Sequence, residues 1–207
     1  MIITACIGHI AMATAQIGKS MLDLKEIIPQ AIYDLKYAST DNFTGAPVPG
    51  YESNQCLLLE EVALALKTVQ HRLQQENLTL VIYDCYRPPV ALNSFITWAQ
   101  QPEDQPLQKQ RFYPRYSRQQ LFELGYLARN SSHTKGTTVD LAIAQAGTPG
   151  EVLDFGGHFD FFDPLSHTLS PDISNQALAN RLYLRELMSD AGLTGISTEW
   201  WHFSYKK

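Results

Sequence analysis

The sequence has few cysteines, no cluster of basic residues and no long hydrophobic run. Its three cysteines, Cys6, Cys56 and Cys85, are scattered and lack a C-x-x-C spacing. This pattern predicts free thiols, with Cys85 a packing residue, rather than a disulfide framework or a thiolate zinc site. The formal net charge of −5 argues against nucleic acid or an anionic membrane as the main partner. We therefore expect a small molecule or a peptide as the partner.

The N-terminal stretch MIITACIGHIAMATAQ is apolar over too few residues to span a bilayer. Its ATA segment is similar to a small-residue cleavage site and its ITAC segment to a lipoprotein box, but a basic region is missing. Residues 1–27 are therefore either an N-terminal extension or the remnant of an export signal, so both a cytoplasmic and a periplasmic location stay open. From residue 28 to residue 207, we expect one globular domain.

Hydrophobic periodicity predicts helices and strands in a mixed order. Helices are expected where apolar residues recur at helical spacing or follow a proline, over residues 55–77, 90–100, 118–129 and 175–190. Strands are expected in short runs rich in β-branched and aromatic residues, over residues 31–38, 78–84, 139–144 and 197–205. Because the order lacks a regular β-α-β alternation, we expect an α+β domain with a mainly antiparallel central sheet flanked by helices.

Two short motifs contain side chains suited to metal chemistry. The first, SSHTKGTTVD, contains His133 and Asp140, and the second, TEWWHF, contains Glu199 and His202. Catalytic zinc usually takes three protein ligands from histidines and carboxylates and leaves a fourth position for water. The set of His133, Asp140 and His202 meets that need. Glu199 would then remain free to accept a proton from the water that the metal acidifies.

Each motif alone also has an ordinary structural interpretation as a loop histidine or a solvated carboxylate. A metal is favoured because Asp140 opens an apolar strand, where an unpaired charge is costly. Residues three apart in a regular strand point to opposite faces, so Glu199 and His202 need a distortion to share a site. We therefore expect a β-bulge around Trp200 and Trp201, which are otherwise ordinary core residues.

An ordered series of motifs resembles the VanX-like D-alanyl-D-alanine dipeptidases, zinc enzymes of the lysostaphin/D-alanyl-D-alanine metallopeptidase group. These motifs are YDLKYASTDNFTG, YDCYRPP, WAQQPED, SSHTKGTTVDLAI, FDFF followed by SH, and EWWHF. They run from about Tyr33 to Tyr205 and so cover most of the chain. The resemblance implies one zinc ion per chain on His133, Asp140 and His202, with Glu199 as general base.

The resemblance also implies roles for residues that metal chemistry alone leaves undecided. Arg87 would stabilise negative charge on the tetrahedral intermediate, and Asp84 would orient the Arg87 side chain. Without the resemblance, Arg87 would be interpreted as a salt-bridge partner in a loop. Asp160 matches an aspartate near the substrate ammonium, although Asp163 is close in sequence, and Ser131 matches a serine that contacts the substrate. Without the resemblance, Asp160 would be interpreted as a helix-capping or loop aspartate, and Ser131 as a turn serine.

Small departures from the family pattern affect packing more than chemistry. Thr138 stands where the family usually has alanine or serine, LAI replaces the commoner LTL, and His158 is outside the expected ligand set. Every residue with an expected catalytic role is present, so we expect activity to be retained.

The function implied by the resemblance is zinc-dependent hydrolysis of the small dipeptide D-alanyl-D-alanine, without nucleic acid or a membrane span. The alternatives are a D,D- or L,D-carboxypeptidase acting on cell-wall peptides, an inert zinc-stabilised binding module, and a metal-free structural protein. Glu199 and Arg87 argue against the binding module, because a structural zinc site needs neither. The oligomeric state, the partner of the substrate carboxylate and the choice between vancomycin resistance, D-alanine salvage and wall turnover stay open.

Overall fold

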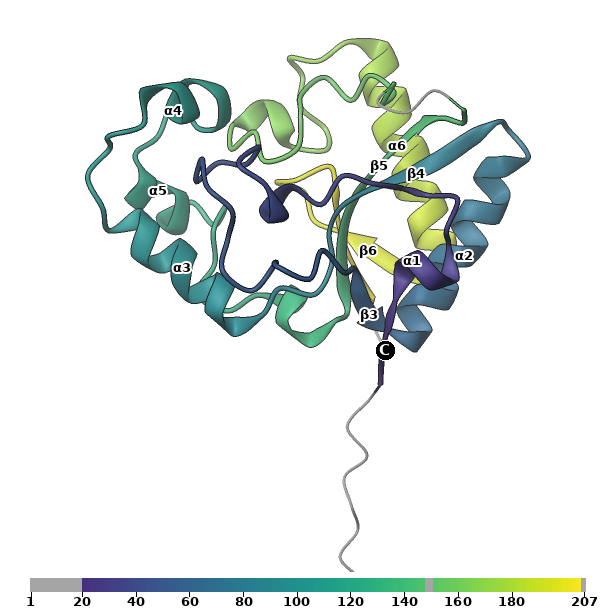
Figure 1. Cartoon of the computed structure of the whole chain (residues 1–207). Coiled ribbons are helices and arrows are strands. Elements are labelled where there is room, and N and C mark those ends of the chain that lie inside the picture. Colours follow the sequence, from purple (N-terminus) through teal and green to yellow (C-terminus); the bar gives the residue numbers. More distant parts are fainter. Residues whose placement is uncertain (1–19, 148–150, 206–207) are drawn as a thin grey trace, which may run out of the picture.

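A five-stranded sheet lies at the centre of the computed structural model, which describes residues 20–147 and 151–205 (Figure 1). The strands follow the order β2-β4-β5-β7-β6. Their bounds are Ile32–Tyr33 for β2, Leu78–Asp84 for β4, Thr138–Gln145 for β5, His202–Tyr205 for β7 and Leu193–Gly195 for β6. Only β2 and β4 pair in parallel, and the other neighbours are antiparallel. The expected α+β class with a mainly antiparallel sheet is confirmed.

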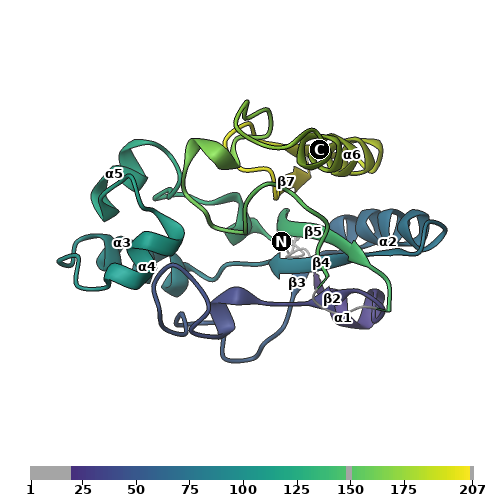
Figure 2. The same cartoon turned by 90° about the horizontal axis from the view of Figure 1, so that it is seen from above.

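The middle of the sheet is formed by β4 and β5, whose residues are buried except for Gln145 at the end of β5. A strand buried on both faces has a continuous apolar sequence, which explains runs such as LVI and LAIA. In both views, α2 and α6 lie together on one side, while α3, α4 and α5 gather on the other (Figures 1 and 2). The helix bounds are Glu60–Gln74 for α2, Pro89–Ala99 for α3, Pro106–Phe112 for α4, Arg118–Glu123 for α5 and Asn175–Asp190 for α6.

Local sequence accounts for the helix boundaries. Ser174 caps α6 by accepting a hydrogen bond from the backbone N–H of Ala177, and α3 begins with Pro89, which needs no backbone donor there. Residues 55–77 were expected to be one helix, but Leu57–Leu59 form strand β3, and α2 begins only at Glu60. The reason is tertiary pairing, because β3 forms an antiparallel ladder with β1, Met21–Asp23.

Other differences from the predicted elements involve short segments. In residues 31–38 only Ile32–Tyr33 is a strand, and the 3-10 turn η1, Lys36–Ala38, follows it. The helix expected over residues 118–129 ends at Glu123. Helix α4 and strand β6 were not predicted, since elements of seven and three residues are too short to establish a clear periodicity.

Residues 21–27, which precede the predicted domain start, already take part in the fold. Strand β1 pairs with β3, and the following helix α1, Leu24–Ile27, buries Leu24 completely. The predicted domain start at residue 28 therefore omits residues that pack on the same core. The possible cleavage site and lipoprotein box lie outside the described residues. Within the described part of the chain, no helix is long and apolar enough to cross a membrane.

Cys56 and Cys85 form a disulfide, so the prediction of free thiols is wrong for this pair. Their Cα atoms are 5.2 Å apart, within the range of natural disulfides, and both side chains are buried. The two cysteines are separated by 29 residues in sequence and belong to no recognisable spacing motif. Only the folding of the chain, which brings the start of β3 to the end of β4, reveals that they are partners.

Candidate metal centre

Three adjacent strands bring two carboxylates and an imidazole into one row. Asp84 ends β4, Asp140 lies in β5 and His202 begins β7. The register pairs Asp84 with Asp140 and Asp140 with His202. Residues directly opposite one another in neighbouring strands present their side chains on the same face. Asp84 enters this row through a register shift between Ile82 and Asp84.

A 3-10 turn brings the second imidazole to the same place. The turn η2, Ser132–Lys135, is capped by the Ser131 hydroxyl, which accepts a hydrogen bond of 3.3 Å from the backbone N–H of His133. Gly136 ends the turn with φ +66°, a left-handed conformation that favours glycine. The turn buries His133, and its Nε2 atom lies 3.3 Å from Oδ2 of Asp140.

The ligating atoms of His133, Asp140 and His202 all lie within 4.8 Å of one another. Nε2 of His133 is 3.4 Å from Nδ1 of His202, which in turn is 3.1 Å from Oδ1 of Asp140. Oδ1 of Asp140 is buried and receives no hydrogen bond. A buried carboxylate that has one oxygen without a hydrogen-bond partner, and whose two oxygens each face an imidazole nitrogen, suits coordination of a divalent cation. The donor set therefore fits a zinc ion.

Glu199 lies in a turn that precedes β7, and its backbone carbonyl accepts a hydrogen bond of 3.4 Å from the N–H of His202. The expected bulge at Trp200 and Trp201 is wrong, because residues 197–201 are not part of a strand. Strand alternation does not apply to a turn, so Glu199 reaches the same side as His202, with Oε2 3.7 Å from Nδ1. Both tryptophans are buried in the core.

Burial raises the pKa of the Glu199 carboxyl to about 8. The imidazole of His202 acts in the opposite direction, and the carboxylate of Asp140 adds to the increase. In the absence of a metal, Glu199 thus readily holds a proton near neutral pH. A carboxyl group with this property is suited to accept and return protons.

Arg87 is held beside the row by the Asp84 carboxylate. Its Nε and Nη2 atoms donate to Oδ2 of Asp84 at 3.2 and 2.8 Å, and Nη2 lies 3.9 Å from Oδ2 of Asp140. The guanidinium also lies over the ring of Tyr37 at 5.3 Å. Oδ1 of Asp84 accepts a hydrogen bond of 2.7 Å from the Tyr51 hydroxyl. Asp84 therefore fixes the direction of the Arg87 guanidinium.

Asp160 is buried, and its Oδ2 atom accepts a hydrogen bond of 2.8 Å from the hydroxyl of Tyr37. Burial raises its pKa well above the usual range. Asp163 is occupied elsewhere, since it caps the turn η3, Pro164–Ser166, and pairs with Arg115 at 2.5 Å. The structure thus gives the two aspartates different surroundings. Tyr37 was missed as a site residue, although it belongs to the YDLKYASTDNFTG motif.

These side chains surround a cavity of about 180 Å³. The predicted site residues in its wall are Arg87, Ser131, His133, Asp140, Asp160, Glu199 and His202. Asp84 does not line the cavity, but its Oδ2 atom contacts two of the lining residues, the Arg87 guanidinium at 2.8 Å and Nδ1 of His133 at 3.4 Å. The cavity is smaller than the pockets that usually bind drug-sized ligands, and it therefore suits a very small substrate.

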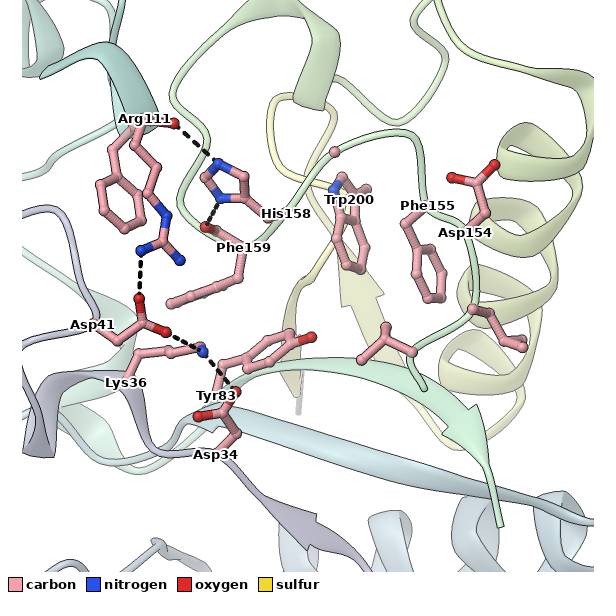
Figure 3. A pocket seen from close by; sticks show the side chains of 14 residues that line it. Asp34, Lys36, Asp41, Tyr83, Arg111, Asp154, Phe155, His158, Phe159 and Trp200 are labelled. Carbon is pink, nitrogen blue, oxygen red and sulfur yellow. Dashed lines mark hydrogen bonds and ion pairs between the residues drawn. The ribbon is translucent and has the colours of Figure 1, made fainter. Parts of the chain in front are cut away.

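A second hollow, of about 360 Å³, contains none of the predicted site residues. Figure 3 shows Lys36 between Asp34 and Asp41, with Nζ at 2.6 and 2.8 Å from their carboxylates, and Arg111 pairs with Asp41 at 2.7 Å. Both ring nitrogens of His158 are hydrogen-bonded to backbone carbonyls here. These charges pair with one another, whereas the metal-centre donors converge on a common point.

Two imidazoles and a carboxylate around one point, with a buried glutamate and an arginine alongside, define a candidate site of the metal-dependent hydrolase class. The chain belongs to the peptidase family described as D-ala-D-ala dipeptidase, which matches residues 18–207. The resemblance found in the motifs is thereby confirmed.

Relatives named D-alanyl-D-alanine dipeptidase occur in several bacteria. The Enterococcus faecalis protein is 41% identical over 88% of this chain and 89% of its own length. The Streptomyces coelicolor protein is 39% identical over the same two shares. The Escherichia coli protein is 34% identical over 88% of this chain and 83% of its own length. The family therefore extends over nearly the whole described fold.

Proposed function

We propose that this chain is a zinc-dependent D,D-dipeptidase that hydrolyses D-alanyl-D-alanine. The observation that carries the proposal is the convergence of His133, Asp140 and His202 in a small cavity that also contains Glu199 and Arg87. Relatives at 34–41% identity that carry the name D-alanyl-D-alanine dipeptidase support the substrate.

The proposed mechanism divides the chemistry among these side chains. His133, Asp140 and His202 would hold the zinc, which when bound supplies Lewis acidity to a carbonyl and lowers the pKa of a water. Glu199 accepts a proton from the attacking water and returns it to the leaving amine. Arg87, fixed by Asp84, stabilises the negative charge that develops on the carbonyl oxygen.

Asp160 and Ser131 would recognise the substrate. Burial raises the pKa of Asp160, but the positive charge of a bound ammonium group favours its ionised form, which then accepts a charge-assisted hydrogen bond; Tyr37 holds the carboxylate in place for this contact. An acetyl group on the nitrogen removes the positive charge and adds bulk in a confined space. The same contact that favours a free dipeptide therefore disfavours longer or N-blocked peptides.

The proposal is tested by the hydrolysis of D-Ala-D-Ala and of N-acetyl-D-Ala-D-Ala, each with and without a chelator. We expect rapid cleavage of the free dipeptide, slow cleavage of the acetylated one and loss of both after chelation. Equal cleavage of both peptides would favour a carboxypeptidase. Bound zinc without cleavage of either peptide would indicate a binding module, and activity that resists complete metal removal would refute the metal mechanism.

A further inference from the structure

The Cys56–Cys85 disulfide lies directly beside the support of a proposed metal ligand. Cys85 follows the last residue of β4, and its backbone carbonyl is 2.7 Å from Nδ1 of His133. A carbonyl oxygen can only accept a hydrogen bond, so Nδ1 carries the proton and donates. The lone pair of His133 then resides on Nε2, the atom that faces Asp140. The Cys85 carbonyl is the nearer of two acceptors at this nitrogen, the other being Oδ2 of Asp84 at 3.4 Å, and it thus favours the tautomer able to bind a metal.

The strand that follows Cys56 is hydrogen-bonded to the segments that carry the two partners of this hydrogen bond. The backbone carbonyl of Leu57 accepts from the N–H of Tyr86 at 3.0 Å, next to Cys85. Two residues further on, the N–H of Leu59 donates at 2.9 Å to the carbonyl of Gly136, which ends the turn that carries His133. β3 therefore holds both the carbonyl and the imidazole, and the disulfide covalently fixes the first of these contacts.

The position of Cys85 also affects the neighbouring acidic group. Its backbone N–H donates to Oδ1 of Asp84 at 2.9 Å, while the other oxygen of that carboxylate binds Arg87. The strand β4 itself is buried in the middle of the sheet and pairs with β5 along its length. Opening the disulfide removes the covalent link at Cys85 but leaves the backbone hydrogen bonds of Tyr86 and Arg87 and the central pairing in place, so we expect a local shift of the Cys85 carbonyl.

We propose that this disulfide is a positioning element of the metal centre, which holds the Cys85 carbonyl where it orients His133 for zinc. Loss of a supporting hydrogen bond to a ligand histidine typically weakens metal binding about 10- to 100-fold, and we expect displacement of the Cys85 carbonyl to act in the same range. The inference rests on the proposed metal site. Because disulfides persist in oxidising compartments and open in reducing ones, the same chain would hold zinc more tightly in the former.

The decisive experiment measures the zinc affinity of the Cys56→Ala/Cys85→Ala variant against the unmodified protein. Metal-free samples compete for zinc with a chromophoric chelator, and the melting temperature of each is recorded in parallel. We expect the zinc Kd to rise about 10- to 100-fold in the folded variant. A Cys6→Ala variant, which keeps the disulfide, should retain the original Kd. An unchanged Kd in the double variant, whatever its melting temperature, would overturn the proposal and leave the disulfide a purely structural role.

A His133→Ala variant tests the zinc-ligand assignment separately from the role of the disulfide. With the disulfide intact, it should lose tight zinc binding; if it does not, the ligand assignment fails independently of the disulfide. If the double cysteine variant does not fold, the unmodified protein is compared before and after treatment with a water-soluble phosphine. The phosphine takes oxygen from water and becomes its oxide, while the S–S bond breaks and each sulfur gains one electron and one proton. An unchanged zinc Kd after confirmed reduction would equally refute the proposal.

Discussion

Breaking the ion pair between Arg87 and Asp84 should cost far more stability than its geometry alone suggests. Its shortest N–O distance is 2.8 Å, and the exposed fractions of the two side chains are 11% and 0%. Arg72 and Asp190 have the same 2.8 Å separation, but with 47% and 60% exposure. The two pairs therefore match in residue type and shortest distance, and they differ in solvation and in a second hydrogen bond of 3.2 Å from Nε of Arg87 to Asp84.

Replacing Asp84 with asparagine leaves the Arg87 charge buried without its main counterion. Removal of one partner from a buried pair typically costs about 3–5 kcal/mol, a large share of the usual stability of about 5–15 kcal/mol for a domain. The hydrogen bonds that Asp84 accepts from Tyr51 and from the N–H of Cys85 increase the demand for a carboxylate here. Asp190→Asn should cause no measurable loss, because water solvates its arginine partner.

The assay is urea unfolding of both variants and the unmodified protein after chelation, so that differences in metal binding do not contribute. We expect the midpoint for Asp84→Asn to fall strongly and that for Asp190→Asn to stay in place. Equal unfolding free energies for the two variants would refute the argument that burial determines the strength of the Arg87 pair.

The remaining predictions concern groups that face the cavity. Glu199→Gln should lower kcat by about 10²–10⁴ with zinc affinity retained in a competition assay, and a near-normal kcat would exclude the general-base role. Tyr37→Phe removes the hydrogen bond to Asp160; since hydrogen bonds to charged groups contribute about 1.5–3 kcal/mol, the KM for the free dipeptide should rise about tenfold or more. Burial raises the pKa of Glu199 from 4.5 to about 8, so the folded metal-free protein binds more protons than the unfolded chain. The unfolding free energy of the metal-free protein should therefore fall as the pH rises from 4.5 to about 8. Denaturant unfolding at several pH values should show a weaker dependence for Glu199→Gln.

The long elements were predictable because their patterns are strong. The strand at residues 78–84 and the helix at residues 175–190 have the predicted bounds, since one is uniformly apolar and the other has helical spacing and a serine cap. The two halves of the candidate centre were also recognisable, because His133 and Asp140 share one motif and Glu199 and His202 another. Pairing of β5 with β7 then brings these motifs together.

What could not be predicted depends on contacts between distant segments. The Cys56–Cys85 bond and the hydrogen bond from Tyr37 to Asp160 join residues whose proximity only the folded chain establishes. The position of Glu199 was misjudged for a local reason. The TEWWHF sequence has the aromatic residues of a strand, yet the backbone turns there and begins β7 only at His202.

The last strand in chain order supplies one imidazole of the candidate centre, and it inserts between β5 and β6. During synthesis, a growing polypeptide therefore presents His133 and Asp140 long before His202 emerges. Full coordination becomes available only when β7 enters the sheet, so metal uptake would mark the completion of folding. A nascent or prematurely terminated chain without this strand would be unable to retain the ion.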